Sequence, residues 1–210
     1  MMNVLIVDDH AIVRKGLKQI LVETSSTFHV DEASSGQEAL DMILQQSYDT
    51  VVLDITMPGR NGLEVLKDIK TQIPGLQVLV LSMHPEDQYA LRVMKAGASG
   101  YLMKESAPDE LVKAIRKVAD GGKYITSTLA EKLADFFGSD RVEKIHERLS
   151  DREFEVLTLI ASGKTVKQIA ENLCLSVKTV STYRSRILEK MMMKTNAEVT
   201  HYAIKNGLVD

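Results

Sequence analysis

The stretch Thr50-Val51-Val52-Leu53-Asp54-Ile55 is rich in β-branched and aliphatic residues and carries one carboxylate, Asp54, near its end. Apolar runs of this length, without polar alternation, are typical of strands that are buried on both faces of a parallel sheet. Shorter or weaker runs of the same kind lie along the chain at residues 4–7, 29–33, 78–81 and 99–103. These five runs predict five strands, with residues 50–55 as the third.

Helical patterns separate the predicted strands and follow the last one. In each gap apolar residues recur at intervals of three and four positions, as in residues 12–21. Strands that alternate with helices predict an α/β fold, here a doubly wound, five-stranded parallel sheet with helices on both faces. The pair Gly121-Gly122 ends the pattern. We therefore expect a first domain over residues 1–122 and a linker over 123–147 that contains a helix near residues 128–137.

Residues 148–210 show helical patterns alone. Two sequences of the capping-box type, Ser150–Glu153 and Thr195–Glu198, are suited to starting helices, and Gly163 is suited to ending one. Between these signals, residues 166–190 have the pattern helix, short turn, helix. We therefore predict a second, all-α helix-turn-helix domain over residues 148–210.

The composition, with 44% hydrophobic and 26% charged residues, is ordinary for a soluble globular protein. No apolar run is long enough to span a bilayer, and the first nine residues lack the basic region of a signal peptide. The one cysteine, Cys174, has no partner within the chain for a disulfide. These features predict a cytoplasmic protein without a membrane partner.

The formal net charge of −3 is divided unevenly along the chain. Residues 1–140 carry 14 Lys and Arg against 20 Asp and Glu, whereas residues 141–210 carry 12 against 9. A basic C-terminal part is compatible with a nucleic-acid partner, although a few charges are weak evidence alone.

Polar and charged residues stand where the predicted strands end. The first strand ends in Asp8-Asp9, the third in Asp54 and the fourth in Ser82, and the fifth runs into Lys104. The carboxyl ends of parallel strands meet at one edge of the sheet, which is where ligands bind in this class of fold. Three carboxylates placed together invite a hard divalent cation. A carboxylate beside Mg²⁺ can attack a phosphoryl group, while a hydroxyl and an ammonium hold its oxygens. Any one of these residues could be a solvated loop charge, but the ordered set is hard to explain by chance.

The N-terminal sequence resembles the receiver domain of two-component response regulators over about residues 2–121. The motifs that carry the resemblance are Val7-Asp8-Asp9-His10, Leu53-Asp54-Ile55-Thr56-Met57-Pro58-Gly59, Asn61-Gly62, Leu81-Ser82 and Tyr101-Leu102-Met103-Lys104. The resemblance implies a flavodoxin-like receiver fold and a sensor histidine kinase as the source of a phosphoryl group.

The same resemblance implies a role for each residue of the pocket. Asp54 would be the phospho-acceptor, and Ser82 and Lys104 would contact the phosphoryl group as catalytic residues. Tyr101 would be a switch residue whose rotamer follows the Ser82 hydroxyl. The implied Mg²⁺ ligands are Asp8 (through water), Asp9, Asp54 and the carbonyl of Thr56.

A polar strip on the predicted helix after residue 176 suggests a nucleic-acid contact. Its hydroxyl-bearing and basic residues are Lys178, Ser181, Thr182, Arg184, Ser185 and Arg186. In a major groove, short polar side chains reach base edges while arginines bind phosphates. A plain amphipathic surface helix would show the same separation of polar and apolar residues on a helical wheel. Residues 148–208 also resemble the LuxR-type helix-turn-helix, on Leu149–Leu157, Gln168-Ile169-Ala170 and Leu175–Tyr183. Together the two halves resemble the NarL/FixJ subgroup.

These features predict a phosphorylation-controlled transcription regulator that binds double-stranded promoter DNA. We expect no enzyme activity beyond its own phosphotransfer and slow dephosphorylation. One alternative is an Asp-nucleophile phosphohydrolase, which commonly needs an acid two positions after the nucleophile; here that residue is Thr56. Another is a DNA binder whose receiver is degenerate, which the complete acidic set argues against.

The active form is expected to be a homodimer that the last helix, residues 197–206, helps to build. Val199, Tyr202, Ala203 and Ile204 give this helix a broad apolar surface. Alternatively, Val199 and Ala203 pack into their own domain and only Tyr202 is spare. The histidines His10, His29, His84, His146 and His201 are scattered without the spacing of a zinc site.

Overall fold

The computed structural model describes residues 1–83, 86–137 and 144–209 of the 210-residue chain. The chain divides into two compact units, Met1–Leu133 and Ala134–Asp210. Each unit buries its own apolar side chains, for example Val52 in the first and Phe154 in the second. Among the described helices, none is both long enough and apolar enough to cross a bilayer.

The first unit contains a parallel sheet in the order β2-β1-β3-β4-β5. Its strands are β1 (Met2–Val7), β2 (Phe28–Ala33), β3 (Thr50–Asp54), β4 (Gln77–Ser82) and β5 (Gly100–Met103). This order and the parallel pairing of every neighbouring strand confirm the predicted doubly wound, five-stranded sheet. Strand β4 ends at Ser82, as predicted, whereas β1 ends at Val7, so that Asp8 and Asp9 follow it.

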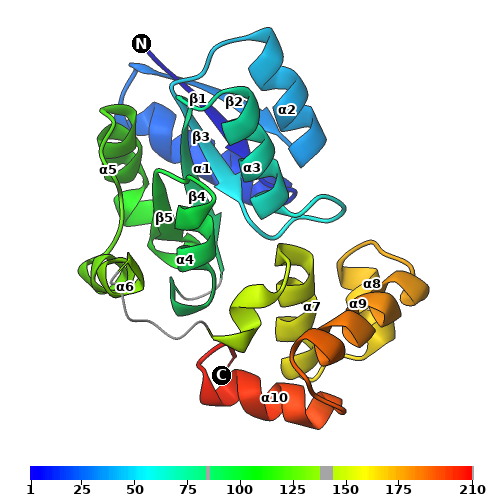
Figure 1. Cartoon of the computed structure of the whole chain (residues 1–210). Helices are drawn as coiled ribbons and strands as arrows, with labels where there is room; N and C mark the ends of the chain where they lie inside the picture. The colour runs from blue at the N-terminus through cyan, green and yellow to red at the C-terminus, as the bar shows by residue number, and fades with distance from the viewer. Residues whose placement is uncertain (84–85, 138–143, 210) are drawn as a thin grey trace. The chain divides into compact units, whose positions relative to one another are not determined.

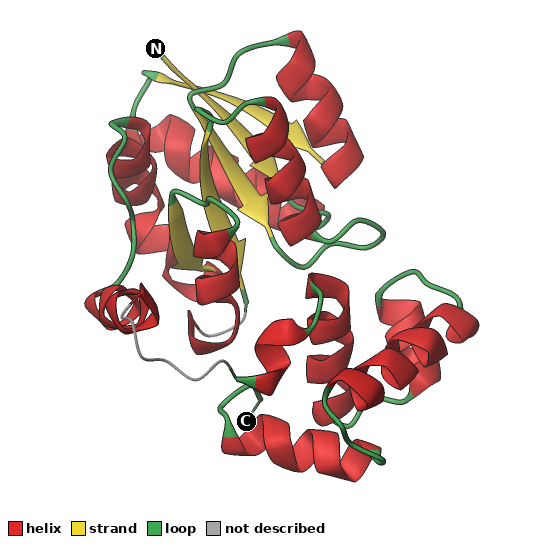
Figure 2. Cartoon of the chain, viewed as in Figure 1, coloured by secondary structure: helices red, strands yellow, loops and turns green. Residues whose placement is uncertain are grey.

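Helices cover both faces of this sheet (Figure 1), and Figure 2 shows the strands enclosed between them. They are α1 (Ala11–Thr24), α2 (Gly36–Gln45), α3 (Gly62–Gln72), α4 (Glu86–Lys95) and α5 (Ala107–Ala119), with a 3₁₀ turn, η1 (Lys104–Ser106), before α5. Helices α1 and α5 pack together on one face, where Leu21 and Ile115 join strand side chains in the core. Helices α2 and α3 lie side by side on the opposite face.

The loop between β3 and α3 folds back onto the strand that carries Asp54. Asn61 caps α3, because its side-chain oxygen accepts a hydrogen bond from the Leu63 N–H at 2.8 Å. The Gly62 N–H donates to the Ile55 carbonyl at 3.1 Å. A Cβ atom added to Gly62 would lie 2.2 Å from the backbone oxygen of Asp54. The start of α3 therefore packs so closely on Asp54 that only glycine fits there.

The chain pairs once more with the sheet after α5. Tyr101 N–H donates to the Tyr124 carbonyl and Tyr124 N–H donates to the Ser99 carbonyl, both at 3.0 Å. Helix α6 (Ser127–Phe137) follows and matches the helix expected near residues 128–137. Residues 138–143 of the expected linker lie outside the described part of the chain.

Among the described residues of the second unit, the regular elements are all helical, as predicted. Its elements are a 3₁₀ turn, η2 (Ile145–Arg148), and the helices α7 (Asp151–Ala161), α8 (Val166–Asn172), α9 (Val177–Lys190) and α10 (Asn196–Lys205). The predicted capping box of Ser150 and Glu153 is present. A second box, formed by Thr165 and Gln168, starts α8 and was not predicted. Gly163 ends α7 with a φ of 80°.

Two expectations about α10 are wrong in detail. Thr195 accepts a hydrogen bond from Glu198 N–H, but the Glu198 carboxylate binds the N–H of Lys194 instead of Thr195, so the capping box is incomplete. Val199 and Ala203 are buried, because α10 packs against α7, and they cannot form a dimer surface. The alternative interpretation of these two side chains is the correct one.

We predict opposite effects from adding the same methyl group at two glycines. Gly62→Ala should lower the free energy of unfolding by about 1–3 kcal/mol, since the methyl group collides with backbone atoms. Gly16→Ala should raise it by about 0.5–1 kcal/mol, because Gly16 lies within α1 and its added Cβ meets nothing within 4 Å. Urea unfolding of both variants and the parent measures the difference. A Gly62→Ala protein as stable as the parent would contradict the close packing.

Candidate functional site

The predicted acidic pocket, defined as Asp8, Asp9, Asp54, Ser82 and Lys104, lies at the carboxyl edge of the sheet. Asp8 directly follows β1, Asp54 and Ser82 end their strands, and Lys104 begins η1 after β5. The structure buries three of these residues, leaving Asp8 and Asp54 1% exposed and Ser82 fully buried. The strand register sets Leu81, the neighbour of Ser82, beside Asp54. The fold therefore collects the residues that the strand ends predicted.

Lys104 joins two of the carboxylates. Its Nζ atom donates to Asp8 Oδ2 and to Asp54 Oδ2, each at 2.7 Å, although these aspartates are far apart in sequence. Burial alone would lower the pKa of Lys104, but the charges of Asp54 and Asp8 outweigh it and raise that pKa. The ammonium therefore stays charged in the pocket.

Asp54 has a perturbed carboxyl group. Burial is the largest cause and raises its pKa, and the Asp8 charge adds to this effect. Lys104 and a hydrogen bond from the Thr56 N–H to Asp54 Oδ1 at 3.1 Å act in the opposite direction. The result is a pKa of about 6. At neutral pH most molecules thus carry an ionised, poorly solvated carboxylate, which is a suitable nucleophile.

The residues of the pocket fit a divalent cation. Asp9 is partly exposed, but within the described structure its Oδ1 atom is buried and has no hydrogen-bond partner. Carboxylate or imidazole atoms of Asp8, Asp9, His10 and Asp54 all lie within 4.8 Å of one another. The His10 imidazole lies 3.0 Å from Asp9 Oδ1 as an ion-pair partner. A cation among these groups would bind the oxygen directly and reduce the repulsion between carboxylates. Thr56, whose carbonyl was predicted as a further ligand, lies exposed in the loop two residues after Asp54.

Two residues beside the pocket were not predicted from the sequence. The Arg14 guanidinium donates to the Asp8 backbone carbonyl at 2.6 Å and lies 3.6 Å from the Glu32 carboxylate. His10 donates its backbone N–H to Asp8 Oδ1 at 2.7 Å, and its imidazole approaches the same carboxylate. The position of Arg14, in the first turn of the helix that follows two aspartates, was the one signal that could have identified it.

Tyr101, the predicted switch residue, is buried with 1% of its surface exposed. It pairs with Val80 in the β4–β5 register, and Ser82 is two positions farther along β4. Because side chains alternate along a strand, Tyr101 and Ser82 belong to the same face of the sheet.

The predicted polar strip of α9 is exposed, whereas Val180 and Ile187 on the other side of this helix are fully buried. The exposed members of the strip are Lys178, Ser181, Thr182, Ser185 and Arg186. The three hydroxyls donate to carbonyls of their own helix four residues earlier. Arg184 differs from the rest because it is half-buried and its Nε–H donates to Asn196 Oδ1 at 2.6 Å.

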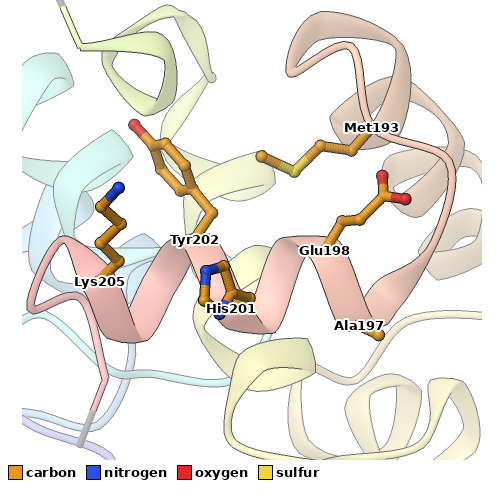
Figure 3. A pocket seen from close by; sticks show the side chains of 6 residues that line it. All are labelled: Met193, Ala197, Glu198, His201, Tyr202 and Lys205. Atoms are coloured by element: carbon orange, nitrogen blue, oxygen red, sulfur yellow. The ribbon is translucent and has the colours of Figure 1, made fainter.

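Helix α10 carries a shallow hollow of about 540 Å³ on its outer surface. Its lining residues are Met193, Ala197, Glu198, His201, Tyr202 and Lys205. Figure 3 shows Met193 reaching along the helix toward Tyr202. The Tyr202 hydroxyl lies 3.0 Å from His146 Nδ1 in η2, and Ile204 is 56% exposed.

Known proteins are similar to this chain over its whole length. Residues 4–116 match the family described as the response regulator receiver domain, and residues 147–203 match the bacterial regulatory proteins of the luxR family. Response regulator UvrY of Escherichia coli strain K12 is 39% identical over 209 residues, which are 99% of this chain and 96% of UvrY. Response regulator GacA of Pseudomonas aeruginosa is 36% identical over 211 residues, 100% of this chain and 99% of GacA.

A solved structure has a similar fold. RcsB from Salmonella enterica serovar Typhimurium, bound to promoter rprA in the presence of the phosphomimetic BeF₃⁻, is 29% identical to this chain. The TM-score is 0.64, and the match covers 96% of this chain and 98% of RcsB.

We predict that Asp54→Asn stabilises the protein in a pH-dependent way. Because the folded-state pKa of about 6 exceeds the ordinary 3.8, ionisation of Asp54 costs stability. The protonated Asp54 carboxyl contributes most to the stability of the folded protein below pH 3.8, and this contribution is lost as the pH rises through 6. The free energy of unfolding of Asp54→Asn should thus exceed that of the parent at pH 7 by on the order of 2 kcal/mol, and this gain should vanish near pH 4.

Urea unfolding in EDTA between pH 4 and pH 8 measures this gain. Asp41→Asn is the matched control, since Asp41 is exposed on α2 and away from the pocket. The control should follow the parent at every pH. A gain for Asp54→Asn that is equal at pH 4 and pH 7 would show that burial does not perturb this carboxyl.

Proposed function

Because the chain belongs to the response regulators that join a receiver domain to a LuxR-type DNA-binding domain, we propose that Asp54 accepts a phosphoryl group and thereby controls DNA binding. The chain is a DNA-binding regulator. The observation that carries the proposal for Asp54 is the pair of 2.7 Å bonds from one partly buried ammonium to Asp8 and Asp54. This arrangement sets a positive charge beside the one carboxylate that ends a central strand.

In the proposed reaction, an Asp54 oxygen attacks the phosphorus of a phosphohistidine on a sensor histidine kinase, and the histidine leaves. Lys104, already bonded to Asp54, compensates the charge that arrives, and the Ser82 hydroxyl donates to a phosphoryl oxygen. Asp8 (through water), Asp9, Asp54 and the Thr56 carbonyl would hold Mg²⁺. When bound, Mg²⁺ neutralises charge on the transferring oxygens. We further propose that the same pocket catalyses slow dephosphorylation by water.

Phosphorylation adds a charge of roughly −1.5 to −2 at the end of β3. Ser82 and Tyr101 lie on neighbouring strands and share a face of the sheet. We propose that Ser82 moves toward the phosphoryl group and that Tyr101 changes rotamer with it. The buried Tyr101 seen here would be one of the two positions.

The proposed roles are divided along the chain, and the boundary between the two compact units, after Leu133, falls within the proposed linker. Residues 1–122 act as the receiver, 123–147 as the linker and 148–210 as the DNA-binding domain. The pairing of Tyr124 with the backbone next to β5 supports a firm attachment of the linker to the receiver.

Helix α9 is the proposed recognition helix. Ser181, Thr182 and Ser185 are exposed and reach base edges, while Lys178 and Arg186 bind phosphates. Arg184 contacts phosphate with the guanidinium nitrogens that its bond to Asn196 leaves available. We propose that the active protein is a homodimer on promoter DNA, since one recognition helix offers little contact area. Ile204 and the hollow on α10 support a dimer contact there.

We predict that Mg²⁺ and a small acyl phosphate label the parent protein on Asp54. Asp54→Asn should abolish labelling, because the amide is not a nucleophile, and Lys104→Met should reduce it strongly. Asp41→Asn should label like the parent. Phos-tag electrophoresis and mass spectrometry of the intact protein measure the label.

Three outcomes separate the competing functions. One stable phosphoryl group per chain supports the receiver. Continuous release of many phosphates per chain would support a phosphohydrolase, and an unlabelled parent that binds DNA would indicate a degenerate receiver.

We also predict that Arg186→Ala weakens binding to all DNA sequences. It should reduce the slope of log affinity against log salt by about one, as expected for one lost phosphate contact. Ser181→Ala should instead alter sequence preference. Fluorescence anisotropy at several salt concentrations measures both effects. Lys113→Ala, which removes an equal charge from α5, is the control, and a slope unchanged by Arg186→Ala would contradict the groove placement.

A further inference from the structure

We propose that His10 is a nitrogen ligand of the acidic pocket and gives its cation site a preference for Zn²⁺ or Co²⁺. The inference rests on the proposed cation site and concerns which ion occupies it. The spacing of the histidines along the sequence predicts no zinc site, because none has a second histidine at ligand spacing. In the structure, the partners of His10 are carboxylates.

The backbone aims the His10 imidazole into the pocket. His10 is the N-cap residue of α1, yet its side chain makes no capping hydrogen bond. Its backbone N–H is instead bonded to Asp8 Oδ1 at 2.7 Å, which draws the residue toward the aspartates. As a result, His10 Nδ1 lies 3.2 Å from Asp8 Oδ1 and 3.0 Å from Asp9 Oδ1.

At these separations the imidazole forms a hydrogen bond or ion pair with the carboxylates, and the same spacing suits neighbouring ligand atoms around one small cation. Two ligand atoms about 2.0–2.2 Å from a metal, at right angles to each other, are about 3 Å apart. Asp9 Oδ1 is also the buried oxygen that has no hydrogen bond among the described residues. An ion bound to Asp9 Oδ1 would therefore also accept an electron pair from His10 Nδ1 after small side-chain shifts, while Asp8 acts through water as in the proposed site.

The donor set determines which ion gains from this arrangement. Imidazole nitrogen binds Zn²⁺, Co²⁺ and other borderline ions well, whereas Mg²⁺ favours oxygen ligands and water. A pocket of carboxylates alone would already bind transition metals more tightly than Mg²⁺. The added nitrogen increases this difference, and it lies at the partly exposed side of the pocket, where His10 is 65% exposed and accessible to solvent ions.

The test compares Co²⁺ and Mg²⁺ affinities of the full chain in the absence of any phosphodonor. His10→Gln removes the imidazole but keeps a neutral polar side chain of similar length. We expect the ratio of the Mg²⁺ to the Co²⁺ dissociation constant to fall by at least about tenfold, since loss of even an outer partner of a metal ligand typically costs 10–100-fold. The visible absorption bands of bound Co²⁺ should also shift when an oxygen replaces the nitrogen.

Two control variants locate the effect. His29→Gln removes an exposed histidine from β2, outside the pocket, and should leave the ratio unchanged. Asp9→Asn should weaken the binding of both Co²⁺ and Mg²⁺, which would show that the two ions share one site. Equal ratios and spectra in the parent and His10→Gln would overturn the proposal, and so would Co²⁺ binding that Asp9→Asn does not affect. Failure of Asp54 labelling with Mg²⁺ would count against the proposed function alone, because the Co²⁺ comparison needs no phosphoryl transfer.

Discussion

The ion pair of Lys104 with Asp8 and Asp54 is the interaction on which the pocket depends. Two nearly buried carboxylates repel each other, and one ammonium at 2.7 Å from each offsets that repulsion. Burial still dominates at Asp54, whose pKa rises to about 6. The pocket is thus short of positive charge until a cation enters, and it already contains the ammonium that the proposed phosphoryl group requires.

The alternation of strands and helices predicts both the sheet and the location of this pocket, because parallel strands present their carboxyl ends at one edge. Finer features depend on distances that a sequence does not contain. Gly62 must be glycine because an added Cβ atom would collide with the Asp54 backbone across the loop. The position of the His10 imidazole depends on a backbone bond to Asp8, so a rule based on histidine spacing misses it.

The C-terminal helices show the same division between pattern and packing. A helical wheel predicts the exposed strip of α9, since it separates Ser181 and Ser185 from the buried Val180. It does not reveal that the turn before α10 brings Asn196 to Arg184. Nor does it show which neighbour covers an apolar face. Val199 is buried within its own domain, where α10 packs on α7.

The residues of the pocket are far apart in the sequence, and this separation determines when, during synthesis and folding, the pocket becomes complete. Lys104 is 96 positions from Asp8 and 50 from Asp54, and it is placed by the strand at the edge of the sheet. Contacts between such distant segments form late in folding, particularly in parallel sheets. During synthesis, Asp54 leaves the ribosome well before Lys104, so a nascent chain has the Asp54 carboxylate without the ammonium that binds it in the folded protein. Only a chain whose β5 has joined the sheet contains the complete pocket, so the proposed phosphoryl transfer to Asp54 belongs to the finished sheet and not to the nascent chain.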